Sequence, residues 1–395
     1  MRHLKNQLIS YRYLWTLLLL SVSFSCGLLS TPEESDRYIA PEPVPISDET
    51  RKEYNTLLQH YFDSTLLHPS LGFSGGILVA KGGTILYEKY QGFEDYPNRK
   101  KPITPNSSLH IASSTKPFTA VAILTLIQSK KLSLTDTLTQ FFPTLPYPGI
   151  TILDLLTHRS GLPNYLYFME TAGWNKQQWV TNQDVLNTLI AKQPAAQATP
   201  NKQFEYCNTN YVLLALLIEK LSGQSYPDYM KEHFFDRLSM HNTFVFQPGE
   251  ETRSTPSYQP NGSIWSLDFL DRTYGDKNIY STPQDLLKWD QALYTDQLVD
   301  TTLLNQAFKG YSFERPGTHN YGLGFRLEFL SNDKKIQYHF GRWHGNNAVF
   351  TRLVDEQVVI IILGNRFNRT IYRAAHNSYD LFGDYYKADT VDEGL

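Results

Sequence analysis

The chain has 395 residues, of which 41% are hydrophobic and 14% aromatic, and its formal net charge is -3. This composition is typical of a globular protein and is large enough for one big domain or two subdomains. Because basic residues are not in excess, the charge argues against a nucleic-acid partner. The sequence shows no low-complexity run and no internal repeat, which excludes a repeat architecture.

The N-terminus has the features of a targeting segment. Basic residues precede an apolar stretch from Leu14 to Phe24, which is too short for a spanning helix and fits a signal-peptide core. Small residues then precede Cys26, as at a bacterial lipoprotein processing site. We expect residues 1–26 to be a signal peptide and Cys26 to carry lipid, which would place the protein in the bacterial cell envelope, periplasmic or on the outer membrane. Plain secretion and an uncleaved anchor remain open alternatives.

Only two cysteines occur, Cys26 and Cys207. If Cys26 carries lipid, Cys207 is a lone small buried residue and no disulfide is needed. Residues 27–47 contain much Pro, Glu and Ser and predict an extended tether. The folded domain is expected over residues 48–385.

Two strand-like runs, Gly75 to Ala80 and Thr84 to Tyr90, are joined by a Lys-Gly-Gly connection typical of a hairpin. Residues 132–275 are mostly helical in pattern. The last third returns to strands, over 321–329, 335–340, 347–354 and 357–363. Strands at both ends of the chain predict an α+β fold, an α/β/α sandwich. Its antiparallel sheet of about five strands is flanked by helices, and a helical subdomain is inserted in the middle. A cleft between the two parts would suit a small-molecule site.

The stretch from Leu109 to Gln128 predicts the central helix of this domain. Small polar residues, Ser113 first among them, suit an N-cap, and Pro117 is tolerated only in a first helical turn. The residues after Pro117 are apolar on nearly every face, as in a helix that is buried all round. The first turn is therefore expected to face a cavity.

Ser113 and Lys116 are three residues apart and share one face of this helix. A serine hydroxyl needs a neighbouring base to become a nucleophile. Burial and the positive end of a helix both favour the neutral lysine that can act as this base. The same helix end stabilises an oxyanion. The alternative is an ordinary capped core helix whose lysine reaches solvent, and Ser331 and Lys334 repeat the spacing in a predicted turn, so the spacing alone is a weak signal.

Tyr206 and Asn208 lie in a loop just before another apolar helix, which extends to Leu221. The tyrosine can pass a proton between a serine and a leaving group, and the asparagine amide can bind a substrate carbonyl or hold the lysine. A turn with a packed tyrosine would have the same sequence. The alternatives stay open at this point.

His339 and Gly341 stand at the end of a predicted strand. A histidine there can bind substrate, and the backbone N–H groups after it can form half of an oxyanion hole, with the N–H of Ser113 as the other half. The alternative is a cross-strand histidine without chemistry.

Five segments occur in a characteristic order: IASSTK, LLTHRSGLP, FEYCNTNYVLLALLIE, IYSTPQDLLKW and HFGRWHG. In this order they resemble the serine β-lactamase-related hydrolases, the group of penicillin-binding proteins, class C-type β-lactamases, esterases and D-amino-acid peptidases. The resemblance covers Asp48 to Asp380 and implies the β-lactamase/DD-peptidase-like fold.

The resemblance also implies roles for individual residues. Ser113 would be the nucleophile that is acylated, Lys116 its base, and Tyr206 the second acid and base. The remaining residues would serve the substrate: Asn208 positions it, His339 and Gly341 belong to the strand beside it, and Arg342 supplies an oxyanion-hole N–H.

The chain departs from the family pattern at two positions. His339 replaces a lysine, so a positive charge for a substrate carboxylate is not assured at neutral pH. Arg342 stands where a small residue is common, and its side chain would bind a carboxylate or partly block the cleft. The first departure favours an esterase or a D-amino-acid peptidase over an efficient β-lactamase.

The remaining histidines indicate no metal site. His158 lies in the turn that the family uses structurally, and His344 has no cysteine or carboxylate partner at a metal-binding spacing. No Gly-rich phosphate loop follows a strand. We therefore expect neither metal nor cofactor.

The sequence thus predicts a serine hydrolase that acts on an ester or amide of a small molecule or peptide through an acyl-enzyme on Ser113. A catalytically inactive envelope protein that uses the same fold for binding or sensing is the alternative. Covalent acylation of Ser113 distinguishes the two. The sequence leaves the acyl group, the leaving group and the oligomeric state open.

Overall fold

The computed structural model describes residues 42–386. The predicted signal peptide, the lipidation site at Cys26 and most of the tether lie outside the described residues, so they stay predictions. Within the described part, no helix is both long and apolar enough to cross a membrane.

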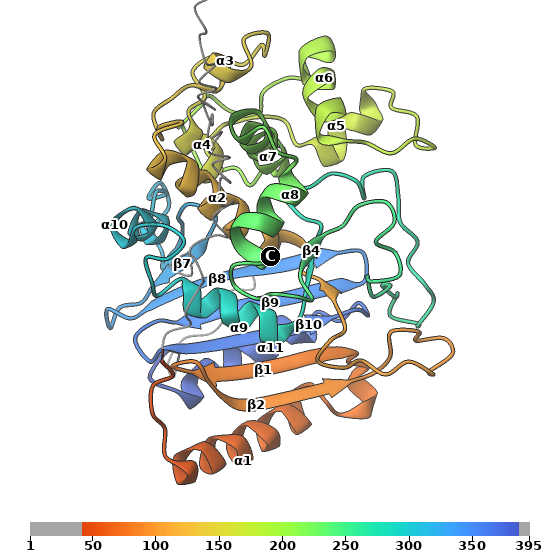
Figure 1. The fold of residues 1–395 in the computed structure, drawn as a ribbon, viewed down its shortest axis with the longest axis vertical. Coiled ribbons are helices and arrows are strands. Elements are labelled where there is room, and N and C mark those ends of the chain that lie inside the picture. The colour runs from red at the N-terminus through yellow and green to blue at the C-terminus, as the bar shows by residue number, and fades with distance from the viewer. Residues whose placement is uncertain (1–41, 387–395) are drawn as a thin grey trace, which may run out of the picture. The chain divides into compact units, whose positions relative to one another are not determined.

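The larger of two sheets has seven strands in the order β2-β1-β10-β9-β8-β7-β6, and every neighbouring pair is antiparallel. Figure 1 shows the two N-terminal strands, in orange, at one edge of this sheet beside the C-terminal strands in blue. The prediction of a mixed fold with a sheet built from both ends of the chain is confirmed. The strands are β1 (Gly75–Lys81), β2 (Thr84–Gln91), β6 (His319–Tyr321), β7 (Arg326–Phe329), β8 (Lys335–Trp343), β9 (Asn346–Leu353) and β10 (Val358–Gly364).

The sheet is larger than the predicted five strands, partly because the single strand expected over 321–329 is a hairpin of β6 and β7. Gly324 turns the chain there with a φ of 81°, a conformation that favours glycine. A Cβ on Gly324 would lie 2.5 Å from the Cβ of Ala120, so the turn packs closely on α2 (Lys116–Gln128). A small second sheet, which the sequence did not predict, has the order β3-β5-β4 and comprises β3 (Leu109–His110), β4 (Phe244–Val245) and β5 (Ile279–Ser281).

The central strands of the large sheet are buried on both faces. In β1, Leu78 and Ala80 belong to one hydrophobic core, whereas Ile77 and Val79 belong to another. This alternation follows from the two-residue period of a strand. It also explains why the sequence of β1 is a continuous apolar run and does not alternate between apolar and polar residues.

Each core is closed by its own helices, as Figure 1 shows. On one face lie α1 (Asp48–Thr65) and α11 (Thr370–Asn377), which contribute Phe62 and Ile371 to that core. On the other face lie α2, α7 (Asn208–Ser222) and α9 (Pro283–Ala292). The other helices are α3 (Leu138–Phe141), α4 (Ile152–Leu156), α5 (Tyr165–Thr171), α6 (Asn182–Lys192), α8 (Tyr226–Met230) and α10 (Thr301–Leu304).

Two predicted helix caps are present. The Thr151 hydroxyl accepts a hydrogen bond from the backbone N–H of Asp154, whose carboxylate in turn binds the N–H of Thr151. Thr282 accepts from the N–H of Asp285, and Pro283 occupies the first position of α9. These caps begin the helices where the local sequence predicts, because capping is a short-range interaction.

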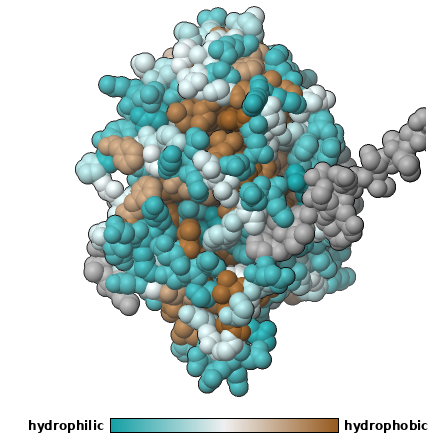
Figure 2. Space-filling model, turned by 60° about the vertical axis from the view of Figure 1, so that its left-hand side comes forward, coloured by the Kyte–Doolittle hydropathy of each residue, from teal (hydrophilic) through white to brown (hydrophobic). Residues whose placement is uncertain are grey.

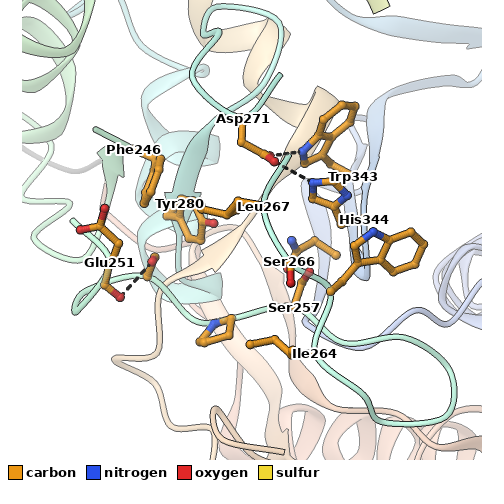
Figure 3. A pocket seen from close by; sticks show the side chains of 14 residues that line it. Phe246, Glu251, Ser257, Ile264, Ser266, Leu267, Asp271, Tyr280, Trp343 and His344 are labelled. Atoms are coloured by element: carbon orange, nitrogen blue, oxygen red, sulfur yellow. Dashed lines mark hydrogen bonds and ion pairs between the residues drawn. The ribbon is translucent and has the colours of Figure 1, made fainter. Parts of the chain in front are cut away.

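Apolar residues remain at the surface in places. Figure 2 shows one face of the molecule, on which hydrophilic residues make up most of the surface and hydrophobic residues gather in patches through the middle. Within the described residues, large exposed apolar side chains include Tyr167, Ile264, Leu267 and Phe313. Ile264 and Leu267 line a cavity of about 180 Å³, which Figure 3 shows together with Trp343 and His344.

Candidate active site

Ser113 lies in a short 3-10 turn, Ala112–Thr115, that leads into α2. The small polar residues of this turn do not cap the helix: the N-cap residue Thr115 makes no side-chain capping bond, so this detail of the prediction is wrong. Ser114 instead donates a 2.9 Å hydrogen bond to the backbone oxygen of His339 in β8. The turn is therefore attached to the sheet through its neighbouring residue, while Ser113 itself stays half-buried.

Two backbone features allow the turn Ala112–Thr115 to lie close to β8. Ala112 has a φ of 48°, in the left-handed region that costs a non-glycine residue about 1–2 kcal/mol. Gly341 lies so close that a Cβ there would stand 2.2 Å from the carbonyl oxygen of Ile111. Only glycine allows this approach. The left-handed backbone of Ala112 and the missing side chain of Gly341 together determine the position of Ser113 relative to β8.

Lys116 is the first residue of α2 and is completely buried. Its Nζ lies 3.0 Å from Oγ of Ser113, 2.8 Å from Oδ1 of Asn208 and 2.9 Å from the backbone oxygen of Asp276. The last two atoms can only accept hydrogen bonds. They therefore use two N–H groups of the lysine and leave its third position, a proton or a lone pair, directed at Ser113. This geometry suits proton transfer between Ser113 and Lys116.

Tyr206 lies over the same lysine, with its ring centre 4.9 Å from Nζ of Lys116. The loop that carries Tyr206 is held by His158. The carbonyl oxygen of His158 accepts the N–H of Glu205 at 2.8 Å, and its Nδ1 accepts the N–H of Cys207 at 3.1 Å. The ring of His158 packs 4.3 Å from that of Tyr206. Burial, together with the charge of Lys116, lowers the pKa of His158 well below its usual value, so His158 is a neutral support.

His339 is buried in β8 and bonded at both ring nitrogens. Its Nδ1 lies 2.8 Å from the backbone oxygen of Phe340, so it must donate there, and its Nε2 accepts from the hydroxyl of Tyr321 at 3.2 Å. Burial, and then the charges of Lys116 and Arg326, hold the pKa of His339 well below its ordinary value. The histidine is therefore neutral at neutral pH and carries no charge for a substrate carboxylate.

Arg326 brings a positive charge close to His339 and contributes to the lowered pKa of that histidine. Its guanidinium carbon lies 5.4 Å from the ring centre of Tyr206. Arg326 pairs across the strands with Tyr338, directly before His339. Among residues 42–386, no carboxylate forms an ion pair with it. The motifs quoted above do not include Arg326, and nothing in the sequence of β7, Arg-Leu-Glu-Phe, distinguished it as a site residue.

The free edge of β8 lies next to Arg326. Strand β9 pairs with β8 as far as Trp343, whereas β7 reaches only to Tyr338. Between His339 and Trp343, no strand of the described chain covers the second edge of β8. Backbone groups of this edge, including the segment with Arg342, are available to an extended substrate. The side chain of Arg342 is exposed.

His344 does have a carboxylate partner, contrary to the reading of the sequence. Its Nε2 lies 2.9 Å from Oδ2 of Asp271, and Nε1 of Trp343 donates to the other carboxylate oxygen at 2.5 Å. Burial raises the pKa of Asp271, but these bonds outweigh it and lower that pKa overall. Ligand atoms of Asp268, Asp271 and His344 lie within 4.8 Å of one another. Because the oxygens of Asp271 already accept these bonds, the group acts as a hydrogen-bonded support for the end of β8.

The structure thus brings together three separate parts of the chain, with Ser113 and Lys116 from the first, Tyr206 and Asn208 from the second, and His339 and Gly341 from the third. Cys207 is free and buried between Tyr206 and Asn208, whereas Cys26 lies outside the described residues. The second Ser-x-x-K sequence has no such surroundings, because Lys334 pairs with Glu356.

The chain is similar to several known proteins over most of its length. A family model described as Beta-lactamase matches residues 68–383. Penicillin-binding protein 4* of Bacillus subtilis (strain 168) is 32% identical over 321 residues, which cover 77% of this chain and 70% of that protein. The solved penicillin binding protein from Bacillus halodurans is 24% identical with a TM-score of 0.72, over 82% of this chain and 99% of that one. The D-amino acid amidase from Ochrobactrum anthropi SV3, complexed with L-phenylalanine amide, is 24% identical with a TM-score of 0.66 and the same coverage.

The shared architecture is that of the penicillin-binding proteins and D-amino acid amidases, and at these identities the two solved structures establish the fold alone. The chain belongs to the serine β-lactamase-related family, whose members are serine hydrolases. It spans less than two thirds of the length of several further curated relatives.

Proposed function

We propose that the protein is a serine hydrolase that cleaves an ester or amide through a covalent acyl-enzyme on Ser113. The observation that carries this proposal is the position of Lys116, whose Nζ lies 3.0 Å from Oγ of Ser113 while two acceptors hold its other hydrogen atoms. A buried lysine with these partners has the geometry of a general base.

In the first half of the reaction, neutral Lys116 takes the proton of Ser113 as Oγ attacks the acyl carbon. The backbone N–H groups of Ser113 and Arg342 would bind the resulting oxyanion. The bond to the leaving group then breaks, and Tyr206 passes a proton to that group. Water next attacks the acyl-serine ester and gives up one proton to the same Lys116–Tyr206 pair. The pair passes a proton to Oγ of Ser113 as its bond to the acyl carbon breaks, which releases the acid and regenerates Ser113.

Arg326 indicates the class of leaving group. It lies beside Tyr206, the residue placed to protonate the leaving group, and has no carboxylate partner within the described residues. A leaving group with a free carboxylate, such as the last residue of a peptide, would provide that partner. The names of related proteins, a penicillin-binding protein and a D-amino acid amidase, fit a D-amino-acid peptidase or an esterase better than an efficient β-lactamase.

We further propose that Cys26 is lipidated and that the protein is attached to a membrane of the cell envelope. The support is the N-terminal sequence alone. Labelling cells that express the full chain with a radioactive fatty acid tests this: Cys26→Ser should remove the label, and labelling of the variant would refute it.

Intact mass spectrometry tests the acyl-enzyme. The domain starting at Asp48 is exposed to a fluorophosphonate and, separately, to a penicillin, beside Ser113→Ala. An adduct with both reagents that depends on Ser113 would support a peptidoglycan-type peptidase, and one with fluorophosphonate alone would support an esterase. No adduct with either reagent, on protein shown to be folded, would overturn the proposal in favour of an inactive binding module.

A further inference from the structure

The position of Tyr206 depends on the loop that carries it. Its ring contacts Lys116 and His158, but its hydroxyl makes no hydrogen bond with any residue of the described range 42–386. The proposed reaction requires this hydroxyl to reach the leaving group. The backbone contacts of the loop therefore determine whether the hydroxyl is in the right place.

An ion pair supports this loop from its more exposed side. The carboxylate of Glu314 accepts the backbone N–H of Phe204, two residues before Tyr206, at 2.7 Å. The same oxygen, Oε1, lies 2.5 Å from Nη1 of Arg159. The side chain of Arg159 is 12% exposed and that of Glu314 is 28% exposed, so the pair is largely shielded from water. The reaction proposed above assigns no role to either residue.

Arg159 joins two loops through its guanidinium group. Its Nε donates to Oδ1 of Asn201 at 2.9 Å, and its Nη2 donates to the backbone oxygen of Asn201 at 3.1 Å. Its Nη1 also donates to Oγ of Ser312, in the loop that carries Glu314, at 3.2 Å. A planar guanidinium with five N–H groups can hold two segments in one relative position, which the single ammonium of a lysine cannot do.

The loop that carries Glu314 is attached to the large sheet. Oδ1 of Asn320 accepts the backbone N–H groups of Tyr311 and Ser312, both at 2.9 Å, and its Nδ2 donates to the backbone oxygen of Ser312 at 2.7 Å. Asn320 lies in β6, directly before the tyrosine whose hydroxyl binds His339. Glu314 therefore connects the Tyr206 loop to the strands that carry the rest of the site.

The charge of Glu314 is retained at neutral pH. Burial raises the pKa of Glu314, but hydrogen bonds from backbone N–H groups and from Arg159 outweigh it and lower that pKa overall. A partly exposed ion pair contributes about 0–1 kcal/mol to stability, so the fold should survive its removal. The contact with the Tyr206 loop is then the property that its removal would change most.

We propose that Glu314 and Arg159 are positioning residues that fix Tyr206 for proton transfer to the leaving group, so that the release of poor leaving groups depends on this ion pair. This inference rests on the proposed function. During acylation the bond between the acyl carbon and the leaving oxygen breaks, the electron pair stays on that oxygen, and the oxygen takes a proton from Tyr206. Lys116, which has received the proton of Ser113, returns a proton to Tyr206. A phenolate with an electron-withdrawing substituent can leave without this proton, whereas a more basic oxygen needs it.

The experiment uses the full chain and substituted phenyl butyrates, from the p-nitrophenyl to the p-methoxyphenyl ester. All of them form the same acyl-enzyme, so differences in kcat/KM report the acylation step. Glu314→Ala should keep kcat/KM for the p-nitrophenyl ester within about three-fold and lower it roughly ten-fold for the p-methoxyphenyl ester, a part of the about 10²–10⁴-fold that general acid–base catalysis supplies. Glu314→Gln keeps an acceptor for the N–H of Phe204 and should lie between the wild type and Glu314→Ala.

Two further variants calibrate the result. Tyr206→Phe should show the strongest dependence on the leaving group, and adding Glu314→Ala to it should not increase this dependence, because both changes act on one proton transfer. Glu356→Ala is the matched control. It removes the ion pair with Lys334, whose side chains are 15% and 21% exposed, at the turn between β9 and β10 and at the opposite end of these strands from Gly341. It should keep the wild-type ratio between the two esters.

The outcomes separate this inference from the proposed function. Equal losses for both esters in folded Glu314→Ala, or a wild-type ratio in both Glu314 variants, would overturn the positioning role and leave the acyl-enzyme intact. A wild-type ratio in Tyr206→Phe would also overturn it, because Tyr206 would then not protonate the leaving group. Absence of any Ser113-dependent hydrolysis or adduct would overturn both proposals.

Discussion

The side-chain oxygen of Asn208 lies 2.8 Å from Nζ of Lys116, although 92 residues separate them in the chain. Each is the first residue of a buried helix, Lys116 of α2 and Asn208 of α7, and these helices pack against each other. The contact therefore depends on how two helix starts are aligned. The orientation of the Lys116 side chain therefore depends on how α2 packs against α7.

This contact predicts the effect of changing Asn208. Asn208→Leu removes an acceptor and leaves one hydrogen of the lysine free to rotate, so acylation of Ser113 by fluorophosphonate should slow by roughly a hundred-fold. Asn208→Asp keeps an oxygen acceptor at this position, so its acylation rate should fall less than that of Asn208→Leu. Equal acylation rates in the wild type and in folded Asn208→Leu would contradict the orienting role of Asn208.

Arg326 should act on substrates that carry a carboxylate in the leaving group. Arg326→Gln keeps a polar side chain but loses the charge, so kcat/KM should fall by roughly ten- to a hundred-fold for a peptide that ends in D-alanine. For the same peptide with an amidated end the fall should be much smaller. Arg373→Gln, at an exposed position of α11 on the other face of the sheet, is the control. Equal losses for both peptides would assign Arg326 to packing.

Gly341 should tolerate no side chain. The Cβ of Gly341→Ala would lie 2.2 Å from the oxygen of Ile111, a backbone atom that cannot move away alone. We expect a loss of about 1–3 kcal/mol in the free energy of unfolding and a larger relative loss of Ser113 acylation. Gly149→Ala is the matched comparison, because its φ is +79° but nothing lies within 4 Å of its Cβ. The free energy of unfolding of Gly149→Ala should fall by only about 1 kcal/mol, the cost of the backbone conformation, and its acylation rate should be unchanged. A similar loss of acylation in both variants would refute the steric explanation.

The stability of the fold should depend on pH through His110. Burial lowers the pKa of His110 from 6.5 to about 4. The unfolded chain therefore binds the proton first as pH falls, so the native state loses stability between pH 6.5 and 4, and the contribution of His110 is about 3 kcal/mol.

Urea unfolding across this pH range measures the loss. The free energy of unfolding should fall less steeply with decreasing pH in His110→Asn than in the wild type. His60→Asn, at an exposed position on α1, is the control for replacing a histidine. Parallel curves for the wild type and His110→Asn would rule out this source of pH dependence.

Much of the fold was predictable because its signals are local. Hairpin chemistry marked β1 and β2, and threonine caps marked the starts of α4 and α9. The division of 321–329 into two strands was missed, since the turn at Gly324 is stabilised by close packing on α2 and not by a turn motif. The 3-10 turn at Ser113 was missed for a related reason: the hydroxyl of Ser114 binds the backbone of β8 and does not cap α2.

The amino-acid sequence by itself determined that Ser113 and Lys116 meet, because residues three apart on a helical turn share a face whatever surrounds them. It also determined the order of the motifs and hence the family. Only the tertiary structure decided which charges and hydrogen-bond partners surround Ser113 and Lys116. The charge comes from Arg326 and not from the buried, neutral His339, and His344 has a carboxylate partner. These relationships depend on strand pairing and on burial, which arise between segments far apart in the chain and leave no mark in the spacing of neighbouring residues.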